Sequence, residues 1–137
     1  MSTPSVKLGY AILFVKDVAA SLTFYEQAFG LSRRFFNDDN DKAYGELETG
    51  AACLAFASLE MAKAQLNQEV TFASPNNPPL GVEVALATSD VGALFSRAIE
   101  AGATSVKEPA TMPWGQTVAY VRDIDGHLIE VCTPIGD

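Results

Sequence analysis

The chain has 137 residues, the usual size of one domain and enough to bury a core without disulfide bonds or metals. Apolar residues make up 48% and charged residues 19%, which is typical of a folded domain and excludes a disordered chain. Nine basic residues against seventeen acidic ones give a net charge of −8, so no cationic face is available for phosphates and nucleic acid is excluded as an expected partner.

The first part of the chain predicts a strand, a helix and three further strands. Residues 10–15 form a short apolar run suited to a buried strand. Asp17 follows at a helix N-cap position, apolar side chains then recur at helical spacing, and Gly30 ends the helix. Three strand-forming runs, separated by turn residues, come next at 33–36, 43–47 and 52–57.

The second part repeats this pattern. An apolar run at 82–87 leads to Asp90, and an amphipathic stretch then continues to Gly102. Strands are expected at 105–107, 117–122 and 128–132. The segment between the two copies contains a short expected helix at 60–66 and a Pro- and Asn-rich stretch that suits an extended linker.

The repeat predicts an α+β fold in which two β-α-β-β-β modules form a curved mixed sheet around a cleft. We expect a single domain over residues 1–137. In this domain module one spans 6–58, the linker 59–80 and module two 81–134. The concave side of the sheet is the predicted place for a ligand.

The opening LGYAILFVKDVAASLTFYEQAFGL and the ending PWGQTVAYVRDIDGHLIEVCTP resemble the vicinal oxygen chelate superfamily, which includes glyoxalases, bleomycin-resistance proteins and extradiol dioxygenases. The resemblance extends over most of the chain, from about Val6 to Pro134. It implies the two-module fold and a homodimer. It does not imply one activity, because the superfamily contains lyases, isomerases, dioxygenases and plain binding proteins.

Metal-dependent members hold a divalent ion with one side chain from the first and last strands of each module, and the resemblance assigns these four positions. They fall on Tyr10, on Glu83, on the strand that carries Cys53 and Ala55, and on Glu130. Only Glu130 matches the superfamily's usual ligand, so we expect no metal site and no cofactor. The alternative is an altered ligand set that binds nickel, zinc, iron or manganese in a lyase, isomerase or dioxygenase.

Without a metal, the two acidic side chains have a different use. If Glu83 and Glu130 approach each other, repulsion between their charges should raise one pKa, which makes the pair a candidate general acid or base. The alternative is that both carboxyl groups are simply polar groups lining a wet cleft, hydrogen-bonded to Tyr10 or to water. The single histidine, His127, follows Gly126 in a turn and is expected at a turn or surface position and not as a ligand.

The candidate ligand-binding residues are taken from the expected concave face and from one loop: Tyr10, Phe14, Cys53, Ala55, Glu83, Trp114 and Glu130. Trp114 stands between Pro113 and Gly115, where its ring can stack on a ligand, plug the end of the core or meet another subunit. The acidic residues and the tryptophan favour a small organic ligand that is planar and cationic. A structural or regulatory domain that uses this face for self-association is a third alternative.

The remaining expectations concern location. No apolar run is long enough to span a bilayer, and the first residues do not form a secretory signal. Cys53 and Cys132 lie in apolar runs, where a cysteine is usually a small buried hydrophobe and not half of a disulfide. We therefore expect a cytoplasmic protein with no membrane partner.

Overall fold

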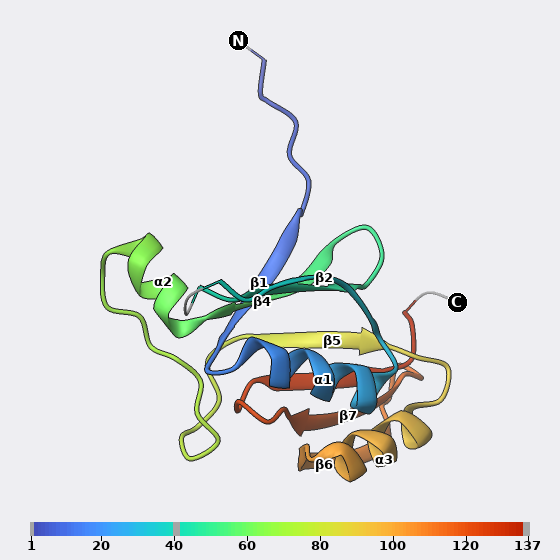
Figure 1. Ribbon diagram of the computed structural model, residues 1–137. Helices are drawn as coiled ribbons and strands as arrows, with labels where there is room; N and C mark the ends of the chain where they lie inside the picture. The colour runs from blue at the N-terminus through green and yellow to red at the C-terminus, as the bar shows by residue number, and fades with distance from the viewer. Residues whose placement is uncertain (1, 40–41, 136–137) are drawn as a thin grey trace.

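The computed structural model describes residues 2–39 and 42–135, and the predicted element order occurs in it twice (Figure 1). Module one consists of β1 (Tyr10–Val15), α1 (Val18–Phe29), β2 (Ser32–Asn37), β3 (Tyr44–Glu48) and β4 (Cys53–Ser58). The linker begins with α2 (Leu59–Leu66). Module two consists of β5 (Glu83–Ala87), α3 (Val91–Ala101), β6 (Thr104–Thr111), β7 (Thr117–Arg122) and β8 (Leu128–Cys132).

Each module forms its own four-stranded mixed sheet, with strand orders β1-β4-β3-β2 and β5-β8-β7-β6. The first and last strands of each module are parallel neighbours, and the other pairs are antiparallel. The predicted α+β fold of two β-α-β-β-β modules is therefore confirmed, with the strands divided between two sheets. Within the described ranges, β1 and β5 each have one edge without a strand partner.

The two long helices begin and end as the sequence predicts. Asp17 accepts a hydrogen bond from the backbone N–H of Ala20, and Asp90 accepts the equivalent bond from Ala93, each at 3.1 Å. Gly30 ends α1 in the left-handed conformation with φ +68°, which a residue with a side chain rarely adopts. Each helix lays an apolar face on one side of its own sheet, where the core lies.

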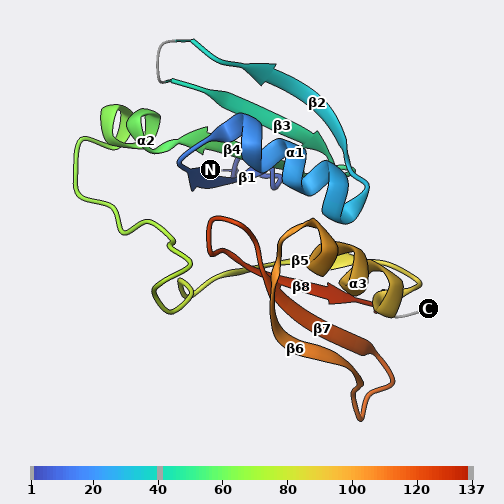
Figure 2. The ribbon, with the colours of Figure 1, turned by 60° about the horizontal axis from the view of Figure 1, so that its bottom comes forward.

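The two modules meet through their helices. Helices α1 and α3 pack against each other and lie between the two sheets (Figure 2). The hydroxyl of Tyr25 on α1 donates to Asp123 at 2.5 Å, and Ser21 donates to Asp125 at 2.6 Å, so polar contacts join α1 to the β7–β8 turn. In each sheet the face away from its helix, here called the open face, is therefore not packed against the other module's helix.

Two sequence expectations need correction. Strand β6 runs over Thr104–Thr111 and is longer than expected, because it is an outer strand and Pro109 falls at an irregularity in its pairing with β7, between Lys107 and Ala110, where a proline is tolerated. His127 lies in the expected turn but is buried, with Nε2 3.2 Å from the carbonyl oxygen of Phe14. Strand alternation could not reveal that β1 packs over this turn.

Candidate functional site: a groove on module two

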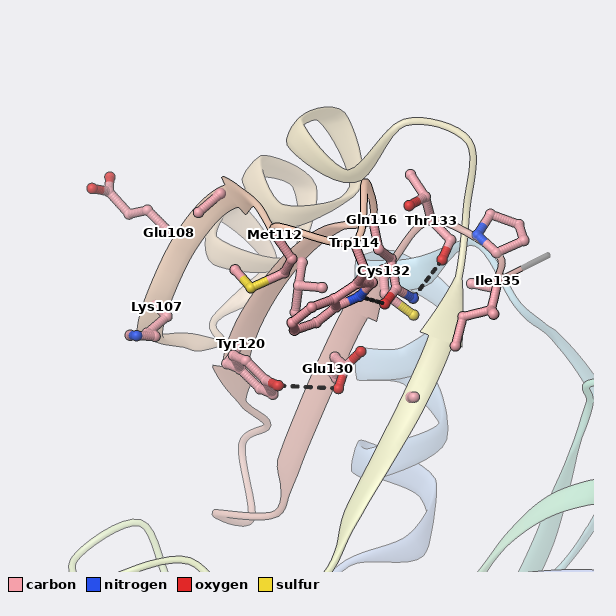
Figure 3. Close-up of a pocket in the computed structure, with 15 residues that line it drawn as sticks. Lys107, Glu108, Met112, Trp114, Gln116, Tyr120, Glu130, Cys132, Thr133 and Ile135 are labelled. Carbon is pink, nitrogen blue, oxygen red and sulfur yellow. Dashed lines mark hydrogen bonds between the residues drawn. The ribbon is translucent and has the colours of Figure 1, made fainter. Parts of the chain in front are cut away.

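The open face of module two forms a groove of about 850 Å³ (Figure 3). Its floor follows from strand alternation, since successive side chains of a strand point to opposite faces of a sheet. On β8, Ile129 and Val131 are fully buried in the core, while Glu130 and Cys132 line the groove. The groove residues on the other strands and on the adjoining loops are Ala85, Ala87, Lys107, Glu108, Ala110, Met112, Trp114, Gln116, Val118, Tyr120, Thr133, Pro134 and Ile135.

A cluster of hydrogen-bonded acids lies on this floor around Glu130. Tyr120 and Glu130 are directly opposite across β7 and β8, and the phenol donates to Oε1 of Glu130 at 3.2 Å. On the other side, Glu83 lies on β5 two residues before Ala85, the partner of Glu130, and the carboxyl groups of Glu83 and Glu130 are close enough to interact. Two carboxyl groups can share a hydrogen bond only when one of them keeps its proton.

The cluster shifts the acid–base behaviour of its members. The hydrogen bond that protonated Glu83 can donate to Glu130, together with burial and the charge of Glu130, raises the pKa of Glu83 to about 7. Burial, followed by the charge of Glu130, raises the pKa of Tyr120. Burial also raises the pKa of the Cys132 thiol, with Glu130 adding to the effect, so this thiol remains protonated at neutral pH and is a poor nucleophile.

Apolar side chains surround the mouth of the groove. Trp114 is 69% exposed, so it does not plug the core, and its indole N–H donates to the side chain of Gln116 at 2.9 Å. Figure 3 shows Met112 beside the indole and Glu130 on the same side of the sheet. In the same view the charged ends of Lys107 and Glu108 point outward from β6, away from Glu130.

The predicted ligand-binding residues fall into two groups. Trp114 and Glu130 line the groove, whereas Glu83 interacts with Glu130 from the neighbouring strand but is not one of the groove-lining residues. The other four lie on the open face of module one, where Tyr10 pairs with Cys53 and Ile12 with Ala55. Cys53 and Ala55 are buried there, and Phe14 makes an edge-on ring contact with Phe72 of the linker.

Module one has a polar cluster of its own on this face. Tyr44 donates to Glu46 at 2.7 Å, and Arg34 lies 3.4 Å from the same carboxylate. Burial, followed by the hydrogen bond to Glu46, raises the pKa of Tyr44. Each open face therefore carries a tyrosine bonded to a glutamate, and in each face a buried cysteine lies on the last strand of the module.

Sequence reasoning missed Tyr120 and proposed Tyr10 as the phenol beside Glu130. Tyr10 is on the other module and is absent from the described lining of the groove. A signal for Tyr120 was available in the short turn between β7 and β8. Counting residues away from this turn on both strands places Tyr120 opposite Glu130.

The residues at the superfamily's four metal positions do not provide a matching donor set. Glu83 and Glu130 lie on the neighbouring strands β5 and β8, whereas Tyr10 and Cys53 lie on the other module. Burial raises the pKa of the Cys53 thiol, which disfavours the thiolate that a metal would need. Over residues 2–39 and 42–135, no three His, Cys, Asp or Glu side chains cluster in a way that could hold a metal ion.

The repeated β-α-β-β-β module and its open sheet faces define a class of small proteins with paired modules. Comparison of this chain with known protein families gives the same class. The model of the Glyoxalase/Bleomycin resistance protein/Dioxygenase superfamily matches residues 7–131. The chain belongs to this superfamily.

The individual proteins that resemble this chain have low sequence identity to it. The uncharacterized protein YwbC of Bacillus subtilis (strain 168) is 27% identical over 125 residues, which cover 90% of this chain and 94% of YwbC. A glyoxalase-related enzyme from Fulvimarina pelagi has a similar structure, with a TM-score of 0.79, 24% identity and coverage of 95% of this chain and 92% of that one. A superfamily enzyme from Burkholderia phytofirmans PsJN gives a TM-score of 0.66, 22% identity and coverage of 93% and 98%. At these identities the structural likenesses establish the fold alone.

Proposed function

We propose that the protein binds a small, planar organic cation in the groove of module two and does so without a metal, like the binding proteins of its superfamily. The observation that carries the proposal is the carboxyl group of Glu130 on the floor of a groove of about 850 Å³, bonded to Tyr120 and next to Glu83 of the neighbouring strand, with the exposed ring of Trp114 at the mouth. The carboxylates supply the charge for a cation, and the indole supplies a flat surface for stacking.

The proposal is tested with 9-aminoacridine, which is cationic at about pH 8, and with acridine, which has the same ring system but is neutral there. Trp114 is the only tryptophan, so its fluorescence reports directly on the groove. We expect saturable quenching by the cation and much weaker binding of the neutral ring. Glu130→Gln should weaken binding of the cation by about tenfold, equivalent to about 1.4 kcal/mol.

Glu108→Gln is the matched control. It removes a charge of the same kind from the groove lining, but the side chain points away from Glu130 (Figure 3). Its affinity for 9-aminoacridine should therefore stay within about twofold of the unmodified protein, because exposed and distant charges interact weakly. Equal binding of acridine and 9-aminoacridine, or equal losses in the two variants, would contradict the proposal.

The metal-free part of the proposal has a separate test. After incubation with excess NiCl₂ or ZnCl₂ and removal of the free ion, we expect far less than one metal per chain by elemental analysis. One tightly bound metal per chain that is lost in Glu130→Gln would contradict it and favour a metal-dependent enzyme.

Any proton transfer in this groove falls to the pair Glu83–Glu130, since a pKa of about 7 suits exchange near neutral pH.

We further propose a homodimer in the cytoplasm. The exposed ring of Tyr10, at 56%, and the unpaired edges of β1 and β5 support association with a second copy. The free and buried thiols of Cys53 and Cys132 suit a reducing compartment. Separately, none of the helices in the described part of the chain has both the length and the apolarity required to cross a bilayer.

A further inference from the structure

Trp114 combines high exposure with a fixed orientation. Its ring is 69% exposed, yet its N–H donates to Oε1 of Gln116 at 2.9 Å. The amide nitrogen of Gln116 in turn donates to the backbone carbonyl of Thr133 at 2.7 Å. Since one end of this amide must accept and the other must donate, the two partners fix which way the Gln116 side chain faces.

The chain of bonds ends on a rigid support. Thr133 directly follows the central strand β8, and its hydroxyl and its backbone N–H both bond to the backbone of Thr117, each at 3.0 Å. At the tip of the hairpin, the N–H of Met112 donates to the carbonyl of Gln116 at 2.7 Å. The indole is therefore linked through Gln116 to the end of the inner strand β8 (Figure 3).

Stability of the fold does not account for this arrangement. An exposed ring gains little from burial, and ordering a side chain costs conformational entropy. The hydrogen bond between the indole and Gln116 is exposed and the one from Gln116 to Thr133 is only partly buried, so together they add little net stability. A fixed ring at the mouth of a groove is, in contrast, what a binding site needs in order to avoid the ordering cost when the ligand arrives.

We infer that Gln116 is a positioning residue that holds the indole of Trp114 as a stacking platform for a fused aromatic ring, so that the groove selects flat cations over aliphatic ones. The inference rests on the proposed function for the identity of the site. It adds the residue that orients the stacking ring, and with it the preference for a flat cation over an aliphatic one.

The first arm of the test uses the protein without ligand. Gln116→Met keeps the length of the side chain but removes both hydrogen bonds, and Gln116→Glu keeps only the acceptor for the indole. We expect faster ring motion in time-resolved fluorescence anisotropy and a weaker near-ultraviolet tryptophan circular dichroism band in Gln116→Met, with a smaller change in Gln116→Glu. Gln65→Met on the exposed face of α2 is the matched control and should change neither signal. Unchanged ring motion in Gln116→Met, with the fold retained in the far ultraviolet, would overturn the positioning role.

The second arm compares 9-aminoacridine with methylammonium, a small and strongly hydrated cation without a ring, by titration calorimetry, which does not depend on tryptophan fluorescence. Gln116→Met should weaken binding of 9-aminoacridine by about tenfold and leave methylammonium within about twofold, because only a flat ring stacks on the platform. Trp114→Leu should show the same selectivity, and the double variant should lose no more than Trp114→Leu alone. Equal losses for both cations would overturn the inference. If the unmodified protein binds neither cation, the proposed function and the stacking role fail together, whereas the first arm still decides whether Gln116 holds the ring.

Discussion

Glu83 is a residue whose surroundings clearly change its acid–base behaviour. Its ordinary pKa of 4.5 rises to about 7 because its protonated form can donate a hydrogen bond to Glu130 and because it is partly desolvated. The folded protein thus prefers the protonated carboxyl, so this group stabilises the fold fully below about pH 4.5 and loses the contribution as the pH rises to about 7. The same deprotonation leaves two carboxylates free to attract a cation.

This linkage predicts opposite effects of pH on stability and on binding. Between about pH 5 and about pH 8, the melting temperature should fall and the affinity for 9-aminoacridine should rise. Glu83→Gln should flatten both trends, since an amide does not titrate. Thermal denaturation and fluorescence titration across this range check the prediction, and trends of unchanged slope in Glu83→Gln would show that another group is responsible.

At the scale of elements, the β7–β8 turn is the part of module two that docks on α1. Asp123 is buried and accepts hydrogen bonds from the hydroxyl of Tyr25 and from the backbone N–H groups of Asp125 and His127. Burial raises the pKa of Tyr25, so its hydroxyl remains a donor over the whole working range of pH. The contact thus combines a fully buried phenol with a buried acid.

Tyr25→Phe removes this donor and leaves the buried Asp123 short of one partner. We expect a loss of about 2 kcal/mol in the free energy of unfolding, since an unsatisfied buried acceptor costs about 1 to 3 kcal/mol. Tyr44→Phe is the matched control, because it removes a bond of 2.7 Å to the partly exposed Glu46, which water can solvate instead. Chemical denaturation should show a loss below about 0.5 kcal/mol for the control. Equal losses would mean that burial of Asp123 is unimportant.

Local patterns predicted the elements well because the physical signals are local. Asp17 and Asp90 as N-caps, with Gly30 and Gly102 at the helix ends, fix both long helices within a few residues. The proximity of Glu83 and Glu130 could be predicted in the same way, because the two residues lie on neighbouring strands. The position of Tyr10 relative to these two residues could not be predicted. Hydrophobic periodicity shows that a helix buries one face, but it does not show how the two modules pack together.

At the scale of the whole molecule, helix-to-helix packing leaves both open faces directed away from the shared core. The groove and the module-one cluster of Tyr44 and Glu46 therefore do not close on each other within one chain. An apolar cavity of about 520 Å³ lies between the modules, and both β1 and β5 contribute to its lining. Unpaired strand edges beside an apolar cavity are a common place for association.

Leu8 provides the test of this association, because it lines that cavity and is nevertheless 74% exposed. We expect the unmodified protein to sediment as a dimer at about 10 µM, and Leu8→Glu to shift it towards the monomer, since a buried unpaired charge at an interface costs several kcal/mol. Leu66→Glu is the matched control, because Leu66 is 47% exposed at the end of α2 and does not line the cavity. Sedimentation of the unmodified protein as a monomer, or dissociation by both variants alike, would contradict a dimer built on these edges. If Leu8→Glu is monomeric yet still binds 9-aminoacridine with unchanged affinity, the groove of module two is complete in one chain, and the partner's module-one face is not part of the site.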